Sequence, residues 1–548
     1  MNTAPVPPWA ASAVFYEIYP QTFQDSDGDG IGDIPGIISR LDYIASLGAN
    51  AIWLNPVYLS PMRDAGYDVA DFRKVDPRYG TFADVQRLFD EAHRRGMRVL
   101  MDFVPGHTSI DHPWFQESAQ ARSNARSNWY IWTDSAWNDG GPEWRGRTVH
   151  GFSDRNGNYL INFFWSQPAL NFGFAEPDPA EPWQLPTTHP DVRKLWDEMR
   201  DTMVFWMKAG ADGFRVDMAG SITRRDPDGR EARRFWAEAR TACEAINPDY
   251  FTVAEWSDPR RALDGRGLHA DFLHWIPTYE NLFRKELGRT PGGPRRQGGA
   301  SWFDREGKGD LRGFLDDYLD HYEATKTHGC ISIPVGNHDL SRISLLRDDD
   351  DLAVVFAFLL TMPGVPFIFY GDEIGLKQVD DAPVREGSYP PRAGARVPMA
   401  WTENDLNRGF SMAEVGKLWA PMDTRSGSPS VESQQADPGS LWHRVRHLIA
   451  LRRTEPALRA TAGFRVLFCE PGRYPFAFLR EGDGQKLLIV LNPSGANQEV
   501  MLPDRLSSIR PPLAGDEIRL YTENAGGTRC VVGPVTYGIL PVTEPDKV

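Results

Sequence analysis

Cysteine is scarce in this chain of 548 residues. The four that are present lie far apart, at Cys243, Cys330, Cys469 and Cys530, and no two have the spacing of a metal site or of a disulfide framework. Neither a zinc site nor a disulfide-stabilised secreted domain is therefore indicated. The N-terminal segment "MNTAPVPPWA" also lacks the basic stretch and apolar core of a secretory signal peptide, so we expect a cytoplasmic protein.

Basic residues are also fewer than acidic ones, 60 against 75, which gives the chain a net charge of −15. This balance argues against nucleic acid or an anionic membrane as a partner, and a small neutral ligand fits better. One segment, residues 352–370, is apolar and long enough to span a bilayer. Because Pro363, Gly364 and Pro366 interrupt it, we expect a buried helix, a turn and a buried strand there. The sequence carries no signal for an oligomeric state.

Short runs of β-branched and aromatic residues recur along the chain, and amphipathic helical patterns separate them. The eight runs begin at Ala13, Ala51, Arg98, Gly213, Tyr250, Asp271, Cys330 and Val365. Alternation of strand and helix predicts a parallel sheet, and eight repeats predict a (β/α)8 TIM barrel, of the α/β class. An open doubly wound sheet is the alternative, but no glycine-rich phosphate loop follows the first run.

Two parts of the chain do not fit a plain barrel. The connection after the third run is too long for a loop, which predicts an inserted subdomain B at residues 107–186. The barrel would then occupy residues 1–106 and 187–460. From Thr461 onward short strand-like runs replace the helices, so residues 461–548 are predicted to form a C-terminal antiparallel β-sandwich domain.

Polar residues collect where the predicted strands end. A single buried polar residue is more often structural, but the loops at this end of a barrel build its active site, so several together favour a functional site. They are Asp102 and His107 after the third run, Arg215 and Asp217 in the fourth, Glu255 in the fifth, and Asn337, His338 and Asp339 in the seventh.

The chain shows carboxylates without a Ser/His/Asp order, a thiol nucleophile or a zinc motif, which favours carboxylate chemistry at an acetal carbon. Glycoside cleavage needs two carboxyl groups, one ionised and one protonated. Arg215, two residues before Asp217 on the same strand face, is expected to keep Asp217 ionised. Glu255, in a partly desolvated site, is expected to have a raised pKa and to act as general acid. An ordinary structural ion pair between Arg215 and Asp217 is the alternative.

Four segments, "DFVPGH", "GFRVDMA", "TVAEW" and "VGNHD", resemble the signature regions of the alpha-amylase family, glycoside hydrolase family 13, in that family's order. The resemblance covers nearly the whole chain. It extends to "AGYDVADF", "GVPFIFYGDEIG" and "ARVPMAW", which are similar to the branch of oligo-1,6-glucosidases, alpha-glucosidases and trehalose synthases.

The resemblance implies roles for single residues. Asp217 would be the nucleophile, Glu255 the acid/base and Asp339 the stabiliser of the transition state. The reaction would retain the anomeric configuration through a covalent glycosyl-enzyme, with the first two carboxyl groups ~5 to 5.5 Å apart. The substrate-binding residues that it implies are Asp64, Tyr67, His107, Arg215, His338 and Arg392. Of these, Asp64 and Arg392 would close the pocket at the non-reducing end, as in an exo-acting enzyme.

Several positions depart from the family pattern near the pocket, among them Ala393 and Gly394, where relatives usually have Asp and Asn. Gly106 stands where the family usually has an Asn that binds calcium between barrel and inserted subdomain, so that calcium site is expected to be absent. Ala169 stands where relatives carry Asp. Met218 follows the nucleophile where the branch commonly uses Val, Ala or Thr to sort linkages, and because Met is larger and flexible, no linkage preference is predicted.

Residues 25–36, "DSDGDGIGDIPG", begin like an EF-hand loop but end in Gly36 where the loop needs a bidentate Glu. By itself this segment is equally consistent with a solvated acidic turn and with a truncated metal site. The family resemblance implies a structural Ca2+, with Mg2+ as an alternative. The ligands that it implies are the side chains of Asp25, Asp27, Asp29 and Asp33 and the carbonyl of Ile31.

We therefore expect a retaining, exo-acting alpha-glucosidase that hydrolyses short alpha-glucosides, with transglycosylation as a side activity. An isomerase of the trehalose synthase type, or another glucosyltransferase of the family, would use the same three carboxylates but keep water out. A non-catalytic amylase-like binding protein is a third hypothesis. It predicts a membrane helix and altered catalytic positions, and the sequence has neither.

Overall fold

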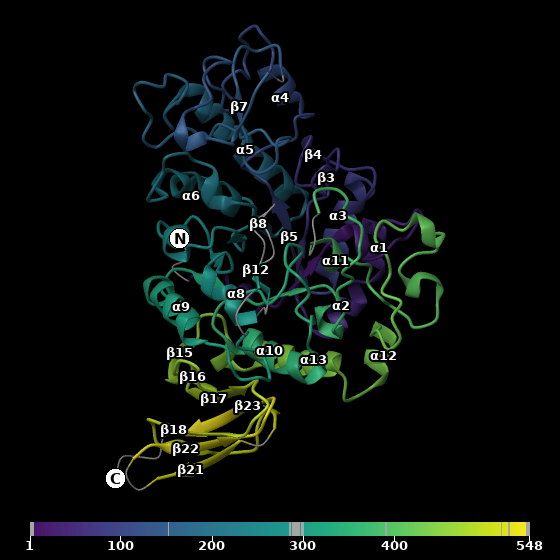
Figure 1. The fold of residues 1–548 in the computed structure, drawn as a ribbon, viewed down its shortest axis with the longest axis vertical. Helices are drawn as coiled ribbons and strands as arrows, with labels where there is room; N and C mark the ends of the chain where they lie inside the picture. Colours follow the sequence, from purple (N-terminus) through teal and green to yellow (C-terminus); the bar gives the residue numbers. More distant parts are fainter. Residues whose placement is uncertain are drawn as a thin grey trace.

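The computed structural model describes residues 5–543, except 152, 284–285, 288–295, 298–300, 389–391, 517 and 524–525. Three regions follow one another along the long axis of the molecule (Figure 1). The segment inserted between β5 and α5 lies at one end, the barrel in the middle and the C-terminal β-sheets at the other end.

The central sheet has eight parallel strands in the order β13-β10-β9-β8-β5-β2-β1-β14. Their bounds are β1 Phe15–Ile18, β2 Ala51–Leu54, β5 Arg98–Phe103, β8 Gly213–Val216, β9 Phe251–Ala254, β10 Ala270–Phe272, β13 Cys330–Ser332 and β14 Phe367–Phe369. Spatial order follows chain order, and the last strand pairs with the first, so the sheet curls into a nearly closed barrel whose two edges are β13 and β14. Each strand overlaps one of the eight predicted runs, which confirms the TIM barrel.

The alternation of side chains along the strands places the polar residues that were singled out. Phe15, Leu100 and Val253 belong to one buried cluster inside the barrel, where Phe15 stacks on Phe367 with ring centroids 4.5 Å apart. Side chains two residues further along a strand point to the same side. Glu17, Asp102 and Glu255 therefore lie above this apolar floor, at the C-terminal ends of their strands.

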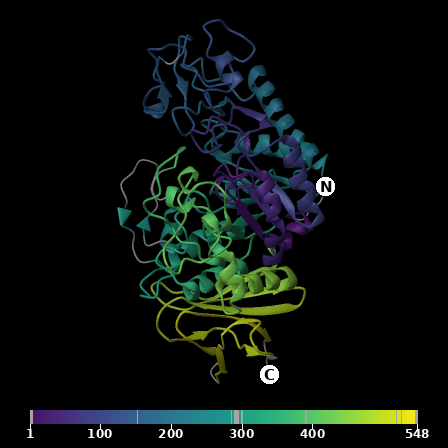
Figure 2. The same cartoon turned by 90° about the vertical axis from the view of Figure 1, so that its right-hand side faces the viewer.

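Helices cover the outside of the barrel (Figure 2). The longer ones are α3 Phe82–Arg94, α5 Pro190–Ala209, α6 Arg230–Glu244, α9 Arg312–Thr325, α10 Asp349–Thr361 and α13 Leu441–Thr454. Shorter ones are α1 Ile34–Ser39, α2 Leu41–Leu47, α7 Pro259–Leu263, α8 Pro277–Phe283 and α12 Val431–Ala436, while the buried α11 Arg392–Ala395 lies next to Asp339. The apolar segment 352–370 is the buried helix α10 followed by a turn and β14, as predicted. Among the described residues, no helix is both long and apolar enough to cross a bilayer.

The inserted segment has little regular structure. It contains α4 Pro113–Ser118, β6 Thr148–Val149 and β7 Tyr159–Leu160. Aromatic packing takes the place of regular elements, since the Phe115 ring stacks on Trp132 and meets Tyr130 and Tyr159 edge-on. A β-bridge between His107 and Ala169 joins the beginning of the segment to a later part of it.

Two antiparallel sheets form the C-terminal region, which confirms the predicted β-sandwich. One contains β15 Gly463–Phe468, β16 Phe476–Gly482, β17 Gln485–Asn492 and β23 Thr536–Thr543, and the other β18 Gln498–Leu502, β22 Thr528–Val532 and β21 Arg519–Thr522. Leu479, Leu488 and Val490 from the first sheet share a buried cluster with Val500 and Cys530 from the second. All four cysteines of the chain are free and buried.

Two buried arginines bind backbone carbonyls at the C-terminal end of α10, and one of them, Arg480, connects the C-terminal sheets to the barrel. Arg480 of β16 donates to the backbone carbonyls of Thr361, at the end of α10, and of Arg459, Ala462 and Gly463. Arg452 of α13 donates to the carbonyl of Met362 at 2.8 Å, directly beyond the same helix. Carbonyls at a helix C-terminus have no partner within the helix and favour a positive charge. These guanidinium groups therefore complete the end of α10.

We predict that Arg480→Met lowers the free energy of unfolding by about 3 kcal/mol, because several buried carbonyls lose their donor. Urea unfolding of the whole chain measures this change. The control is Arg473→Met, which removes an exposed pair with Glu470 and should cost less than about 1 kcal/mol. Equal midpoints for the two variants would contradict the role given to Arg480.

Candidate active site

Arg215 stands at the centre of the predicted site and joins carboxylates from three neighbouring strands. Its Nη1 lies 2.9 Å from Asp102 Oδ1 and 3.0 Å from Asp217 Oδ1, and its Nη2 lies 2.6 Å from Glu255 Oε2. Arg215 is fully buried, and burial opposes its charge, but the three carboxylates outweigh this and hold its pKa well above the usual value. The catalytic carboxylates predicted from β8 and β9 are thus brought together.

Asp217 and Glu255 differ in the protonation that their surroundings favour. Burial, reinforced by the nearby Glu255 and Asp102 charges, raises the pKa of Asp217 well above its ordinary value despite Arg215. Burial also opposes ionisation of Glu255, but Arg215, His274 and the Trp275 indole outweigh it and hold the pKa of Glu255 well below its ordinary value.

This distribution is the reverse of the sequence-based expectation, in which Asp217 was ionised and Glu255 held the proton. The reason is geometric. The shortest contact of Arg215 goes to Glu255, and Trp275 donates to the other oxygen of that carboxylate at 2.8 Å. These donors could not be placed from the sequence, since His274 and Trp275 come from the loop after β10.

Asp339, which follows β13, is paired with two arginines. Arg392 Nη2 lies 2.6 Å and Arg396 Nη2 3.0 Å from its Oδ1. Burial opposes the charge of Asp339, but Arg392, His338 and Arg396 outweigh it and lower the pKa to about 2. Asp339 is therefore an ionised carboxylate near neutral pH.

The residues expected at the non-reducing end lie beside Asp339. Arg392, the first residue of α11, has its Nη1 3.7 Å from Asp64 Oδ1. Gln167 Nε2 donates to the other oxygen of Asp64 at 2.7 Å. Burial raises the pKa of Asp64 to about 7, with Arg392 acting against it. Asp64, Arg392 and Asp339 thus form one charged cluster, which we call the end cluster.

His338 and Tyr67 form one wall of the site. Their rings stack with centroids 5.2 Å apart, and the Tyr67 hydroxyl donates to Asp102 Oδ2 at 2.8 Å. His338 Nδ1 lies 2.7 Å from Glu17 Oε1, and burial lowers the pKa of His338 well below its ordinary value. Sequence reasoning missed Glu17, although a lone acidic residue inside the apolar run "AVFYEIY" was a usable signal.

His107 lies in the site but does not contact the acids through its ring nitrogens. Asn162 Nδ2 lies 3.1 Å from His107 Nδ1, and His107 Nε2 lies 3.0 Å from the carbonyl of Tyr67. Arg224 donates to Asn162 Oδ1 at 3.0 Å, which fixes the orientation of the amide, so Asn162 donates to the histidine. Burial lowers the pKa of His107 to about 4, and the ring is neutral.

Asn162 also accounts for two of the unusual positions. A Cβ on Gly106 would lie 2.5 Å from Asn162 Nδ2, closer than two such atoms can approach, so the amide occupies the space that a side chain at position 106 would need. The same Nδ2 lies 3.6 Å from Met218 Sδ, next to the predicted nucleophile. Asn162 had no motif to mark it in the sequence.

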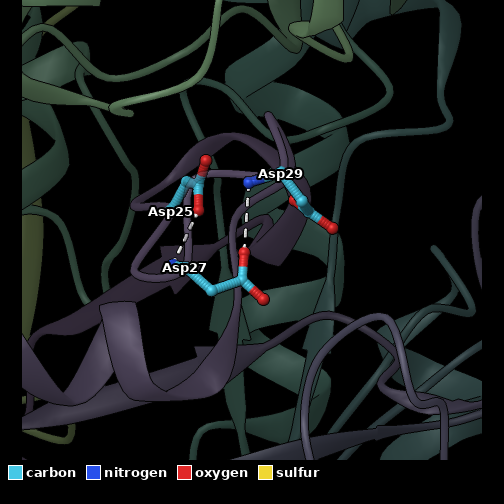
Figure 3. A group of neighbouring side chains, drawn as sticks. All are labelled: Asp25, Asp27 and Asp29. Atoms are coloured by element: carbon cyan, nitrogen blue, oxygen red, sulfur yellow. Dashed lines mark hydrogen bonds between the residues drawn. The ribbon is translucent and has the colours of Figure 1, made fainter.

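The acidic loop lies between β1 and α1, apart from these residues. Asp25, Asp27 and Asp29 each place a carboxylate oxygen within 4.8 Å of the others (Figure 3). Burial and the neighbouring carboxylates raise the pKa of Asp29, so a cation would relieve an unfavourable accumulation of like charge. Asp33 accepts from Ser26 and Gly36 and caps α1. An all-oxygen donor set of this kind suits Ca2+ or Mg2+.

A parallel barrel that carries several buried carboxylates at its C-terminal face is the arrangement of a glycoside hydrolase, and the family model and the relatives of this chain show that it is one. The chain belongs to the alpha-amylase family, in the branch of oligo-1,6-glucosidases, alpha-glucosidases and trehalose synthases, since the family model "Alpha amylase, catalytic domain" matches residues 17–266 and 304–461. The family expected from the signature segments is confirmed.

Individual relatives cover most of the chain. The oligo-1,6-glucosidase of Heyndrickxia coagulans is 30% identical over 90% of this chain and 94% of its own. The trehalose synthase/amylase of Mycobacterium tuberculosis (strain ATCC 25618 / H37Rv) is 32% identical over 90% of this chain and 84% of its own. Among solved structures, the trehalulose synthase of Pseudomonas mesoacidophila MX-45 is similar with a TM-score of 0.76 and 26% identity, over 98% of this chain and 100% of the other.

We predict that Gly106→Ala lowers kcat/KM by about tenfold, equivalent to about 1.4 kcal/mol, because the new methyl group displaces Asn162 from His107 and Met218. Steady-state kinetics on a short alpha-glucoside measures the loss. Gly416→Ala is the control, since a Cβ there meets no atom within 4 Å.

A double-mutant cycle tests the cause of that loss. If the clash with Asn162 is responsible, Gly106→Ala should cost much less in an Asn162→Ala background than in the wild type. Additive losses would show that Gly106 acts through some other neighbour.

Proposed function

We propose that the protein is a retaining, exo-acting alpha-glucosidase that hydrolyses short alpha-glucosides, with transglycosylation as a side activity. The observation that carries this proposal is the end cluster. Arg392 lies 2.6 Å from Asp339, the carboxylate expected to bind the sugar, and 3.7 Å from Asp64, and this supports closure of the pocket by Asp64 and Arg392. A pocket closed beside the reacting sugar admits the end of a chain and excludes internal glucose units.

The proposed reaction has two displacements at the anomeric carbon. The Glu255 carboxyl gives its proton to the glycosidic oxygen as the bond from that oxygen to the anomeric carbon breaks, and an Asp217 oxygen forms the new bond. Glu255, now a carboxylate, then takes a proton from water, whose oxygen attacks the same carbon and releases Asp217. Two inversions give net retention. A sugar hydroxyl in place of that water gives transglycosylation.

This chemistry requires Asp217 to attack as a carboxylate and Glu255 to enter with a proton. Arg215 contacts both carboxyl groups, and its distance to Glu255 is the shorter of the two.

An isomerase is the second candidate, supported by the similarity to a trehalose synthase/amylase and to a trehalulose synthase. Incubation with maltose separates the two candidates. Glucose release supports the hydrolase, and trehalose without glucose supports the isomerase. A panel of disaccharides with different linkages, followed by product analysis, then defines the preferred bond. A cytoplasmic location is part of the proposal and is supported by the four free cysteines.

We predict that Asp217→Asn and Glu255→Gln each lower kcat by about a thousandfold or more while the fold persists, because each removes a group that takes part in bond making. Circular dichroism checks the fold, and mass spectrometry excludes deamidation of the new Asn. Asp483→Asn, an exposed change in the C-terminal region, should keep full activity. An active, intact Asp217→Asn protein would refute its role as nucleophile.

We also propose that Asp25, Asp27 and Asp29, together with Asp33 and the carbonyl of Ile31, bind a structural Ca2+ or Mg2+. Support comes from the close approach of the first three carboxylates and from the like-charge repulsion among them. The loop holds none of the catalytic carboxylates, so the cation would act on stability.

We predict that a chelator lowers the thermal midpoint of the protein, because a ligand that binds only the folded state stabilises it. Activity well below that midpoint should change much less. Adding back Ca2+ or Mg2+ separately identifies the cation, and Asp27→Asn should reduce the chelator effect. A chelator-treated protein shown to be metal-free, with an unchanged midpoint, would return the loop to a solvated acidic turn.

A further inference from the structure

The loop after β10 places a tryptophan directly against the proposed acid/base. Trp275 Nε1 donates to Glu255 Oε1 at 2.8 Å, while Arg215 binds the other oxygen of the same carboxylate. The Trp275 backbone is held as well, since its amide donates to Ser257 Oγ at 3.0 Å. The indole therefore fixes the plane of the Glu255 carboxyl group from the side opposite to Arg215.

Trp275 differs from the groups around it in its exposure. Trp275 is 46% exposed, whereas Glu255 and Asp217 are each 8% exposed. Part of the residue is thus open to solvent, while its indole N–H is bonded to a buried carboxylate. An indole presents a wide apolar face, on which the C–H face of a pyranose ring can stack.

The positions of the end cluster and of Glu255 determine which sugar can contact the exposed part of Trp275. The end cluster lies at the closed end, where the sugar being cleaved is held. A general acid protonates the oxygen between that sugar and the leaving group, so an exposed group bonded to the acid lies on the leaving-group side. This placement rests on the proposed function, because it takes Glu255 as the acid.

We propose that Trp275 positions the acid/base through its N–H and that its exposed face binds the departing sugar and the acceptor sugar that replaces it. The ligand of this face is a neutral pyranose. Trp275 would then influence whether water or a sugar hydroxyl receives the glucosyl group.

The positioning role has a defined sign in a pH profile. An N–H that donates to Glu255 favours its ionised form, and Glu255 must be protonated to act as an acid. Removing the N–H raises the pKa of Glu255, so the basic limb of the kcat/KM profile moves to higher pH. The other charged or titratable groups that face Glu255 stay the same in this variant. They are Arg215 and Asp217 from β8 and its loop, His274 beside Trp275, and Asp339 from the loop after β13.

Two variants separate the two roles. Trp275→Phe keeps an aromatic face and loses the N–H, and we expect the basic limb for maltose to rise by about half a pH unit with little change in KM. Trp275→Ala loses the face as well, and we expect the ratio of transfer to hydrolysis at high maltose to fall about fivefold. The control is Trp137→Phe, a tryptophan that is 96% exposed in the inserted segment.

A wild-type basic limb in Trp275→Phe would overturn the positioning role. A wild-type product ratio and KM in Trp275→Ala would overturn the stacking role. Binding without turnover keeps this test separate from the proposed function. The difference in fluorescence between Glu255→Gln and Glu255→Gln/Trp275→Phe isolates the emission of Trp275, and maltose should change it. Inactivity of the wild type on every glucoside refutes the proposed function, whereas a Trp275 emission that maltose leaves unchanged refutes the stacking face.

Discussion

The guanidinium of Arg215 partly neutralises the negative charge of three buried carboxylates, which would be very unfavourable without it. It bonds to Asp102, Asp217 and Glu255, all in the interior, and it lies 5.0 Å above the Trp53 ring. Removing one partner of such a group leaves uncompensated charge in a medium that solvates it poorly. The strand register that pairs Asp102 with Arg215 is therefore tied to the chemistry, because a shift of one residue would turn these side chains away from one another.

The barrel could be predicted because its signals are local. Each strand is a short run of apolar residues, and the alternation along the run places Asp102, Arg215 and Glu255 on the inner side with no knowledge of other strands. The roles of Asp217, Glu255 and Asp339 came from segments whose order resembles that of a known family. That resemblance also led to Asp64 and Arg392, which are 328 positions apart (392 − 64) and in contact in the fold.

What could not be predicted depends on contacts between distant segments. The pKa of Glu255 depends on burial and on Arg215, and also on His274 and Trp275 from the loop after β10, which lies 20 residues further along the chain. His107 has its ring nitrogens occupied by Asn162 and the Tyr67 carbonyl, which its position after β5 did not indicate. In the sequence, Gly106 stands where the family usually has an Asn that binds calcium. In the fold, the Asn162 side chain occupies the space that a side chain at position 106 would need, so the glycine and Asn162 belong to one arrangement.

The contact between Arg480 and the end of α10 has a consequence for how the protein is made. Thr361 and Arg480 are separated by 119 positions in the chain. During synthesis the ribosome exposes α10 and β14 well before it exposes β16. We therefore expect the end of α10 to lack the Arg480 donor until the first C-terminal hairpin emerges, so that this hairpin stabilises a domain translated before it.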